Sequence, residues 1–277
     1  MFRKIIRLGK KKNLSRFKLL RDLYDKFIRI EFPYSLKIQG VKMRHAQLRF
    51  WIDGYHEKGT TDFIFSKLKK GDTFIDVGTH FGYYTAIAAS IVEDSGVVYS
   101  FEPSPRNFQC LKDTVKANKF DNVICENSAV SNKTEDRFFY ISGSGTGIDS
   151  LIKSDVHNNK VKVKAVSLDD YFKEISLQNI NMVKIDAEGA DIEVLEGMKK
   201  IIDFNPDINI IVEFSPKNIL QTSDYGPAEF LDQLNSMSLD YKILENVDIK
   251  NKQELVGYAT KNGHVNLLCT KSIISQV

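Results

Sequence analysis

The sequence predicts an α/β protein whose strands form one doubly wound, mostly parallel sheet. Short runs rich in β-branched residues alternate with amphipathic stretches of helical length, as they do when helices connect parallel strands. Residues 208–214 are almost continuously apolar, which is typical of a strand buried on both faces. A chain of 277 residues with 42% hydrophobic and 27% charged side chains suits a globular protein of this kind.

The first elements can be placed in order along the chain. T-F-I-D-V at residues 73–77 predicts a strand, and a helix should begin near Gly82, directly after it. A second strand at residues 97–102 precedes Pro103 and Pro105, which favour the start of a helix. This strand–helix–strand–helix order is the unit from which parallel sheets are built.

The alternation changes after a third strand, predicted at residues 122–127. Residues 137–141 and 161–166 predict two further strands, and the Gly/Ser-rich segment 142–147 lies between them. We expect a β insertion after the third strand, with antiparallel pairing and a loop that could cover a substrate.

The remaining elements resume the parallel series and close the sheet. A strand is predicted at residues 181–186, followed by a helix over Ile192, Leu195 and Met198. After the apolar strand at 208–214 we expect a helix over Phe230, Leu231 and Leu234, then closing strands near residues 241–244 and 265–270.

The first strand ends in D-V-G-T-H-F-G, and ligands of such sheets bind at the carboxyl ends of the strands. Gly78 allows a sharp turn, and Gly82 lets the helix begin close to a ligand. The G-x-G-x-x-G fingerprint of dinucleotide sites is absent. Asp76 would repel a phosphate, so a cationic group such as an ammonium or a sulfonium is the better ligand here.

Glu102 ends the second strand, 26 residues after Asp76. An acidic residue at about 20 residues beyond a Gly-rich turn is placed to accept hydrogen bonds from ribose hydroxyls. Together the two acids and the turn favour an adenosine ligand without phosphates. S-adenosylmethionine meets that description, whereas NAD and ATP do not.

The fourth parallel strand runs into K-I-D-A-E-G-A-D, with Asp186 at its end and Glu188 two residues later. Two carboxylates beside a nucleotide site could accept a proton or share a cation, and the alternative is a helix N-cap. We assign both a catalytic role, in which one of them takes the proton of an acceptor hydroxyl or orients that hydroxyl. No cluster has the spacing of a known metal site, so no metal is predicted.

Six motifs occur in a fixed order: F-I-D-V-G-T-H-F-G-Y-Y-T, Y-S-F-E-P-S-P-R-N-F, N-S-A-V-S, V-S-L-D-D-Y-F, V-K-I-D-A-E-G-A-D-I-E-V-L-E-G and I-I-V-E-F-S-P. Together they resemble the FkbM-type methyltransferase family over roughly residues 55–240. The resemblance implies the Rossmann-like class I methyltransferase fold, with an antiparallel closing strand, and S-adenosyl-L-methionine as the methyl donor. Members usually act on a hydroxyl oxygen.

The resemblance also implies which residues hold the donor. It puts Asp76, Gly78 and Gly82 at the methionine end, Glu102 at the ribose, and Ser128 with Ala129 near the adenine.

Further contacts are expected around this cofactor site. Glu57, in Y-H-E-K-G-T-T, matches a family glutamate that is expected to close over the cofactor. Tyr83 and Tyr84 open the first helix and could face the cofactor, although Tyr84 equally suits the core.

Two positions depart from the family pattern. The turn usually reads D-V-G-A-N-x-G, whereas this chain has Thr79 and His80, so His80 is expected to replace the amide as a hydrogen-bonding group. Asp191 stands where Glu or His is commoner, which affects only contacts with the substrate. His45, His56 and His80 are rival bases, but their spacing forms no triad.

The N-terminal segment is strongly basic. Residues 1–30 hold eleven Lys or Arg and two Asp, a net charge of +9, while the rest of the chain carries −6. Apolar residues recur in this segment at spacings of three and four, so residues 1–35 predict a basic amphipathic helical extension before a single domain at 36–277. Anionic lipid, a polyanionic substrate, another subunit or the domain itself could contact it. No nucleic-acid partner is expected.

Several protein classes are disfavoured by the composition. No run approaches the roughly 18 apolar residues of a membrane-spanning helix, and no secretory signal is visible. Cys110, Cys125 and Cys269 lie far apart without a C-x-x-C pair, which indicates buried thiols in a reducing compartment. We expect a cytoplasmic protein that could lie peripherally at a membrane surface.

The expected function is methyl transfer from S-adenosylmethionine to a hydroxyl of a saccharide, a lipid-linked glycan or a secondary metabolite. A nicotinamide-dependent oxidoreductase and a non-catalytic nucleotide-binding scaffold stay open as alternatives. Residues 36–60, 142–160 and 216–227, which should select the acceptor, carry no recognisable motif.

Overall fold

The structure is a computed structural model that describes residues 36–44, 48–142, 149–155, 157–176, 179–245 and 247–272. The predicted basic extension at residues 1–35, His45 and the Gly/Ser-rich segment beyond Ser142 lie outside the described residues. Among the helices of the described ranges, none combines the length and the apolar character needed to cross a membrane.

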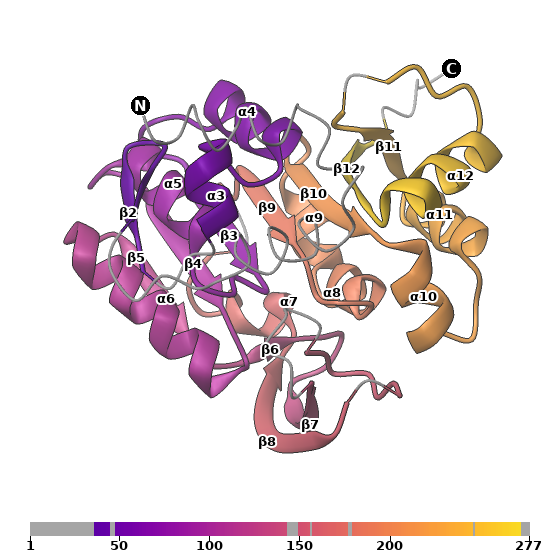
Figure 1. Cartoon of the computed structure of the whole chain (residues 1–277), viewed down its shortest axis with the longest axis horizontal. Helices are drawn as coiled ribbons and strands as arrows, with labels where there is room; N and C mark the ends of the chain where they lie inside the picture. Colours follow the sequence, from indigo (N-terminus) through magenta and orange to yellow (C-terminus); the bar gives the residue numbers. More distant parts are fainter. Residues whose placement is uncertain are drawn as a thin grey trace, which may run out of the picture.

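A seven-stranded sheet forms the centre of the molecule (Figure 1). In sheet order its strands are β11 (Leu239–Ile243), β12 (Val265–Lys271), β10 (Asn209–Phe214), β9 (Met182–Ile185), β3 (Thr73–Val77), β4 (Val97–Phe101) and β5 (Val123–Glu126). Neighbours are parallel from β10 to β5, and β12 runs antiparallel to both of its neighbours. The predicted doubly wound sheet with an antiparallel closing strand is confirmed.

The direction of strand order reverses between β3 and β9. From β3 the chain proceeds to β4 and β5 on one side, and from β9 it proceeds to β10 on the other. A crevice at such a switch point binds the ligand in doubly wound folds. The predicted turn after β3 and the acidic motif after β9 therefore meet at one place.

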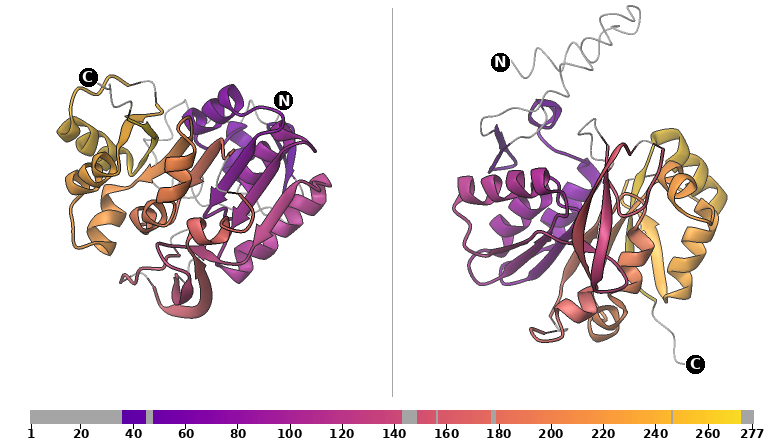
Figure 2. Two further views of the ribbon diagram at one scale, coloured as in Figure 1. Left: turned by 180° about the vertical axis from the view of Figure 1, so that it is seen from behind. Right: turned by 90° about the horizontal axis from the view of Figure 1, so that it is seen from below.

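Helices cover both faces of the sheet (Figure 2). One buried cluster contains residues of α4 (Lys58–Lys67), α5 (Tyr83–Val92), α6 (Pro105–Asn118) and the hairpin of β1 (Leu36–Ile38) with β2 (Val41–Met43). The other contains residues of α8 (Asp191–Glu196), α9 (Lys199–Phe204), α11 (Pro227–Ser236) and α12 (Lys252–Asn262). Short helices α3 (Leu48–Asp53), α7 (Leu168–Tyr171) and α10 (Pro216–Thr222) complete the fold.

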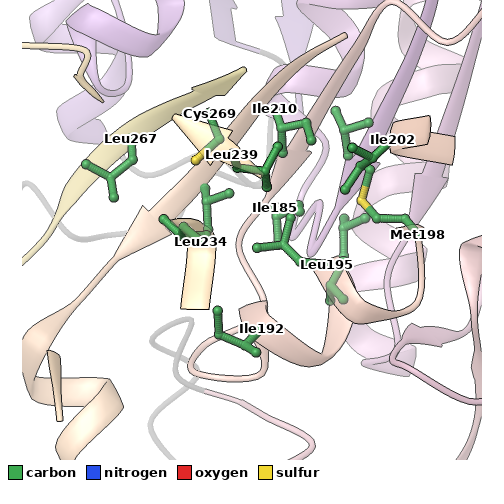
Figure 3. Packing of buried hydrophobic residues seen from close by; sticks show 14 of the residues in the cluster. Ile185, Ile192, Leu195, Met198, Ile202, Ile210, Leu234, Leu239, Leu267 and Cys269 are labelled. Carbon is green, nitrogen blue, oxygen red and sulfur yellow. The ribbon is translucent and has the colours of Figure 1, made fainter. Parts of the chain in front are cut away.

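The two clusters together explain the apolar sequence of β10, because Ile210 and Val212 belong to the second cluster and Ile211 to the first. Ile210, Ile211 and Val212 are all fully buried, as predicted for a strand covered on both faces. Figure 3 shows Ile185 of β9 and Ile210 of β10 in the same cluster as side chains from α8, α9 and α11. Burying one such side chain stabilises the fold by about 1.5–3 kcal/mol.

The predicted insertion forms a separate three-stranded sheet of order β6-β8-β7, which projects from the lower edge of the molecule in Figure 1. β7 (Glu135–Ile141) and β8 (Asn159–Val166) pair antiparallel, as expected. β6 (Ala129–Val130) adds parallel to β8 and is too short to be predicted from periodicity. Phe139 and Leu151 of the insertion are buried against the domain.

Some predicted boundaries were wrong. The helix expected over Ile192, Leu195 and Met198 ends at Glu196, and Gly197 and Met198 separate it from α9. A Cβ at Gly197 would overlap the backbone of Ser131, so only glycine fits there. β11 begins at Leu239, two residues before the predicted strand. Cys110 and Cys269 are buried and form no disulfide, whereas Cys125 is only partly buried.

Candidate active site

A cavity of about 380 Å³ lies at the carboxyl ends of β3, β4, β9 and β10. The segment between α3 and α4, the β insertion and the residues before β12 complete its wall. Eight of the predicted site residues line it: Glu57, Gly78, His80, Tyr83, Glu102, Ala129, Asp186 and Glu188.

The turn after β3 brings two strand ends into contact. Gly78 has a φ of +76°, and a Cβ there would overlap the backbone oxygen of Asp186 at the end of β9. The N–H groups of Gly78 and Thr79 both donate to the carbonyl of Phe101 at the end of β4, at 3.0 and 3.3 Å. The turn is thus fixed between its two neighbouring strands.

Glu102 is held at the cavity by backbone groups. The N–H of His80 donates to Oε2 at 2.8 Å, and the N–H of Ser104 donates to Oε1 at 2.9 Å. Burial raises the pKa of Glu102 to about 8, although both hydrogen bonds favour the charged form. Each carboxylate oxygen has a second lone pair for a ligand hydroxyl, as predicted for ribose recognition.

His80 contributes its backbone to this arrangement. Its φ of +54° lies in the left-handed region, which Asn adopts more readily than most residues. The conformation therefore explains why the turn usually carries Asn at the position that His80 occupies here. The His80 ring packs edge-on against Phe81, with the ring centroids 4.6 Å apart.

Asp76, Gly82 and Ser128 do not line the cavity. Thr85 of α5 donates to Oδ2 of Asp76 at 2.6 Å, and burial raises the pKa of Asp76 to about 6. At Gly82 a Cβ would lie 2.7 Å from Cδ1 of Leu111, so the missing side chain lets α6 pack closely here. Direct contact of these three residues with a ligand stays a prediction.

A row of buried polar side chains crosses the sheet beneath the cavity. Ser100, Asp76 and Lys184 occupy neighbouring register positions on β4, β3 and β9. Glu213 and Asn266 face each other on β10 and β12. Because side chains alternate along a strand, all five lie on the same side of the sheet.

Lys184 supplies the positive charge of this row and is 1% exposed. Its Nζ lies 3.4 Å from Oδ2 of Asp186 and donates to the carbonyl of Ile185 at 3.1 Å. Burial opposes the charge, but Asp186, Glu57 and Glu213 together raise the pKa of Lys184 well above its usual value. It therefore stays protonated and balances the acids around it.

Asp186, Glu188 and Glu213 each offer an oxygen within 4.8 Å of the other two. Burial disfavours the charge of Asp186, but Lys184 outweighs this effect and lowers its pKa. Burial and the neighbouring Asp186 raise the pKa values of Glu188 and Glu213 well above normal. The charged form is thus favoured at Asp186 and disfavoured at the two glutamates.

The turn that carries these acids is fixed by its own neighbours. Asp191 accepts from the N–H groups of Ala187 and Gly189 at 2.9 and 3.1 Å, which gives this departure from the family pattern a structural role. Asn218 of α10 donates to Oε2 of Glu188 at 2.8 Å.

Glu57 is bound by residues from several elements. Tyr84 of α5 and Asn266 of β12 donate to Oε2 at 2.6 and 2.7 Å. Nε2 of His264 lies 3.2 Å from Oε1, and Nε2 of His56 lies 3.6 Å from it. Burial opposes the charge, yet His56, His264 and Lys184 hold the pKa of Glu57 well below its usual range.

Three residues of the site were missed by the sequence analysis. Lys184 and Glu213 are charged residues within apolar strands, and that contrast was the signal available for both. His264 lies far along the chain, before β12, and no motif marks it.

Known proteins similar to this chain are methyltransferases. A family model described as the methyltransferase FkbM domain matches residues 76–242. The chain is 28% identical over 124 residues to protein-L-isoaspartate O-methyltransferase of Methanococcus aeolicus, covering 42% of this chain and 56% of that protein. It is 24% identical over 165 residues to hexuronic acid methyltransferase AglP of Haloferax volcanii, covering 56% and 61%. The chain thus spans less than two thirds of either relative's length.

A solved structure with a similar arrangement is the methyltransferase FkbM of Methylobacillus flagellatus. It gives a TM-score of 0.44 at 12% identity and covers 80% of this chain and 52% of that one. The family model itself runs from the end of β3 into β11 and spans more than half of this chain. The chain belongs to the FkbM methyltransferase family.

Proposed function

We propose that this protein transfers a methyl group from S-adenosylmethionine to a hydroxyl oxygen of a saccharide. The observation that carries the proposal is the charge of the cavity wall. Six carboxyl side chains and no Lys or Arg are found among its described residues. The carboxyl groups are Glu57, Glu102, Asp149, Asp186, Glu188 and Glu213. The charged forms of Glu57 and Asp186 are favoured, so the wall suits a cationic adenosyl donor and disfavours the pyrophosphate of a nicotinamide cofactor.

The residues present fit the adenosyl group of this donor. In its charged form Glu102 can accept from both ribose hydroxyls, because its backbone partners leave one lone pair on each oxygen. Thr79 has a buried hydroxyl with no hydrogen-bond partner among the described residues, and Thr79 lines the cavity. A buried polar atom in this state favours a bound ligand that satisfies it.

The acidic turn after β9 can orient an acceptor hydroxyl. Asp186 is charged and can accept a hydrogen bond, while protonated Glu188 can donate one. Alignment of the reacting oxygen supplies up to about 7–11 kcal/mol in favourable intramolecular models. Of the two roles predicted for these residues, orientation is the one that their protonation states favour.

The acceptor class is supported by aromatic side chains in the cavity wall. Phe50, Tyr83 and Phe139 bring aromatic side chains to a cavity that is otherwise rich in hydrogen-bonding groups. Sugars present apolar ring faces together with hydroxyl edges, so this mixture suits a saccharide. The relative whose name refers to hexuronic acid methylation supports the same class. A lipid-linked glycan or a secondary metabolite with sugar-like hydroxyls fits the same chemistry.

Titration calorimetry tests the donor. We expect one site for S-adenosylmethionine and for its demethylated product, and no heat with NADH. At pH 9, above the raised pKa of Glu102, Glu102→Gln should weaken both ligands by about 10–100-fold, since it removes charge-assisted hydrogen bonds of about 1.5–3 kcal/mol. Glu135→Gln, an exposed change on β7, is the control. Binding of NADH without binding of the methyl donor would refute the proposal, and binding of neither would favour the scaffold alternative.

Methyl-labelled donor and a panel of methyl glycosides test the acceptor. The panel contains a neutral hexoside, an amino-hexoside and a hexuronoside. We expect transfer to the neutral or amino sugar, giving an ether that survives mild alkali. Label that is released by mild alkali would instead show an ester formed on a carboxylate, and would contradict transfer to a hydroxyl.

A further inference from the structure

We propose that His264 is the catalytic base, and that its Nδ1 takes the proton of the acceptor hydroxyl while Glu57 holds Nε2. This inference rests on the proposed function and names the proton acceptor of the same site. His264 directly precedes β12 and lines the cavity. Its side chain is 44% exposed, so a substrate can reach it.

The first step is the orientation of the imidazole ring. Nε2 lies 3.2 Å from Oε1 of Glu57, whose other oxygen is occupied by Tyr84 and Asn266. Glu57 itself has a φ of +43°, an uncommon conformation for a residue other than glycine. A carboxylate fixed in this way holds the ring of His264 at one angle, as a third group orients the base in nucleophile–base pairs.

The second step is the position of the proton on that ring. A charged carboxylate accepts hydrogen bonds and cannot donate one, so the nitrogen that faces Glu57 must carry hydrogen. The neutral ring then has its lone pair on Nδ1. Nδ1 lies 3.6 Å from Oε1 of Glu213, which is beyond hydrogen-bond distance. The lone pair is therefore available to an acceptor hydroxyl in the cavity.

The third step compares His264 with the other candidates. Asp186 is a weak base because the neighbouring Lys184 stabilises its charge. At Glu188, burial and the neighbouring Asp186 raise the pKa and favour the protonated form, which cannot accept a proton. His264 has a raised pKa because Glu57 bonds to it, while burial and Lys184 oppose the shift and Asp186 adds to it. Glu213, Glu245 and His56 are the other ionisable groups near the ring. A base that titrates near neutral pH suits proton transfer best.

The chemical step then balances. Bound S-adenosylmethionine supplies a methyl carbon on a positively charged sulfur, and a C–O bond forms as the C–S bond breaks with its electron pair remaining on sulfur. Nδ1 of His264 receives the hydroxyl proton. The resulting imidazolium lies against the negative charge of Glu57. His264 returns the proton to water before the next turnover.

A nitrogen NMR titration of the full-length protein tests the geometry without any acceptor. Histidines carry ¹⁵N labels, and His264→Gln identifies the signals of residue 264. We expect the neutral ring to carry its proton on Nε2, with a pKa that Glu57 raises above its usual value and that falls in Glu57→Gln. A proton on Nδ1, or an unchanged pKa in Glu57→Gln, would overturn the proposal.

Transfer to the best glycoside of the panel tests the chemistry. His264→Gln should slow single-turnover transfer by about 10²–10⁴-fold, leave the affinity for the demethylated donor within about twofold, and remove the acid limb of the pH–rate profile. His157→Gln is the control, because His157 bonds to Ser154 in the insertion and does not line the cavity. Normal transfer by His264→Gln with the wild-type pH profile would refute the base while leaving the methyltransferase assignment intact. If the wild type methylates none of the glycosides, the NMR result alone decides the proposal.

Discussion

Three carboxyl groups at this site are buried so deeply that burial disfavours their charged forms. Burial raises the pKa of Glu102 to about 8 and those of Asp76 and Asp191 to about 6. Each of the three accepts hydrogen bonds from backbone N–H groups or from a hydroxyl, so none lacks a partner. A group whose pKa is raised on folding reduces the free energy of unfolding as the pH rises past its unfolded value. Ligand recognition by these acids thus opposes stability at neutral pH.

Glu102→Gln tests this opposition through the pH dependence of stability. The folded state keeps a proton on Glu102 up to about pH 8, whereas the unfolded chain loses it near 4.5. Between pH 5 and 8 the free energy of unfolding of the wild type should therefore fall relative to the variant, by about 1.4 kcal/mol per pH unit. Urea unfolding at four pH values measures the difference. A difference that is constant with pH would contradict the raised pKa.

At the scale of helices and strands, periodicity and strand-end motifs predicted the central elements and the place where they meet. The alternation of strand and helix patterns located β3, β4, β5, β9 and β10, and the strand-end acids Glu102 and Asp186 line the cavity. Lys184 and Glu213 could not be assigned to the site in advance, because their meeting depends on the register between β9 and β10. The contacts of Glu57 join residues about 200 positions apart, which no local pattern encodes.

The close approach of β3 and β9 depends on the absence of a side chain at Gly78. Gly78→Ala should destabilise the fold far more than Gly71→Ala, although both glycines have a positive φ. The nearest atom to a Cβ at Gly71 is Oγ of Ser95 at 3.7 Å, so this variant carries only the backbone penalty of about 1–2 kcal/mol. At Gly78 the Cβ also overlaps the backbone of Asp186, which should add about 1–3 kcal/mol. Equal losses in urea unfolding would show that the close approach of β3 and β9 is unimportant.

Across the whole molecule, charge is distributed unevenly. The first 30 residues carry +9 and the remainder −6, and the cavity wall is rich in carboxyl groups. The cavity therefore suits a cationic donor and a neutral or cationic acceptor, while the basic segment suits an anionic surface. We propose that residues 1–30 bring the enzyme to anionic lipid, where a lipid-linked acceptor would be concentrated. The division of the chain at residue 35 stays a prediction.

Deletion of residues 1–30 tests this distribution of roles. The intact chain should sediment with vesicles that contain phosphatidylserine and not with pure phosphatidylcholine, since each Lys or Arg near an anionic surface contributes about 1 kcal/mol. Binding should disappear between about 0.1 and 1 M salt, as the Debye length falls from about 10 to about 3 Å. The shortened chain should not sediment but should still bind the demethylated donor.

The matched control for this deletion replaces Lys160, Lys162 and Lys164 with Gln. These three exposed lysines on β8 form the rival basic surface, where Lys160 lies over the ring of Phe138 at 4.1 Å. Vesicle binding should survive in this triple variant, because the N-terminal charge is intact. If the triple variant loses binding while the shortened chain keeps it, the insertion rather than the N-terminal segment contacts the lipid, and the proposed role of residues 1–30 is wrong.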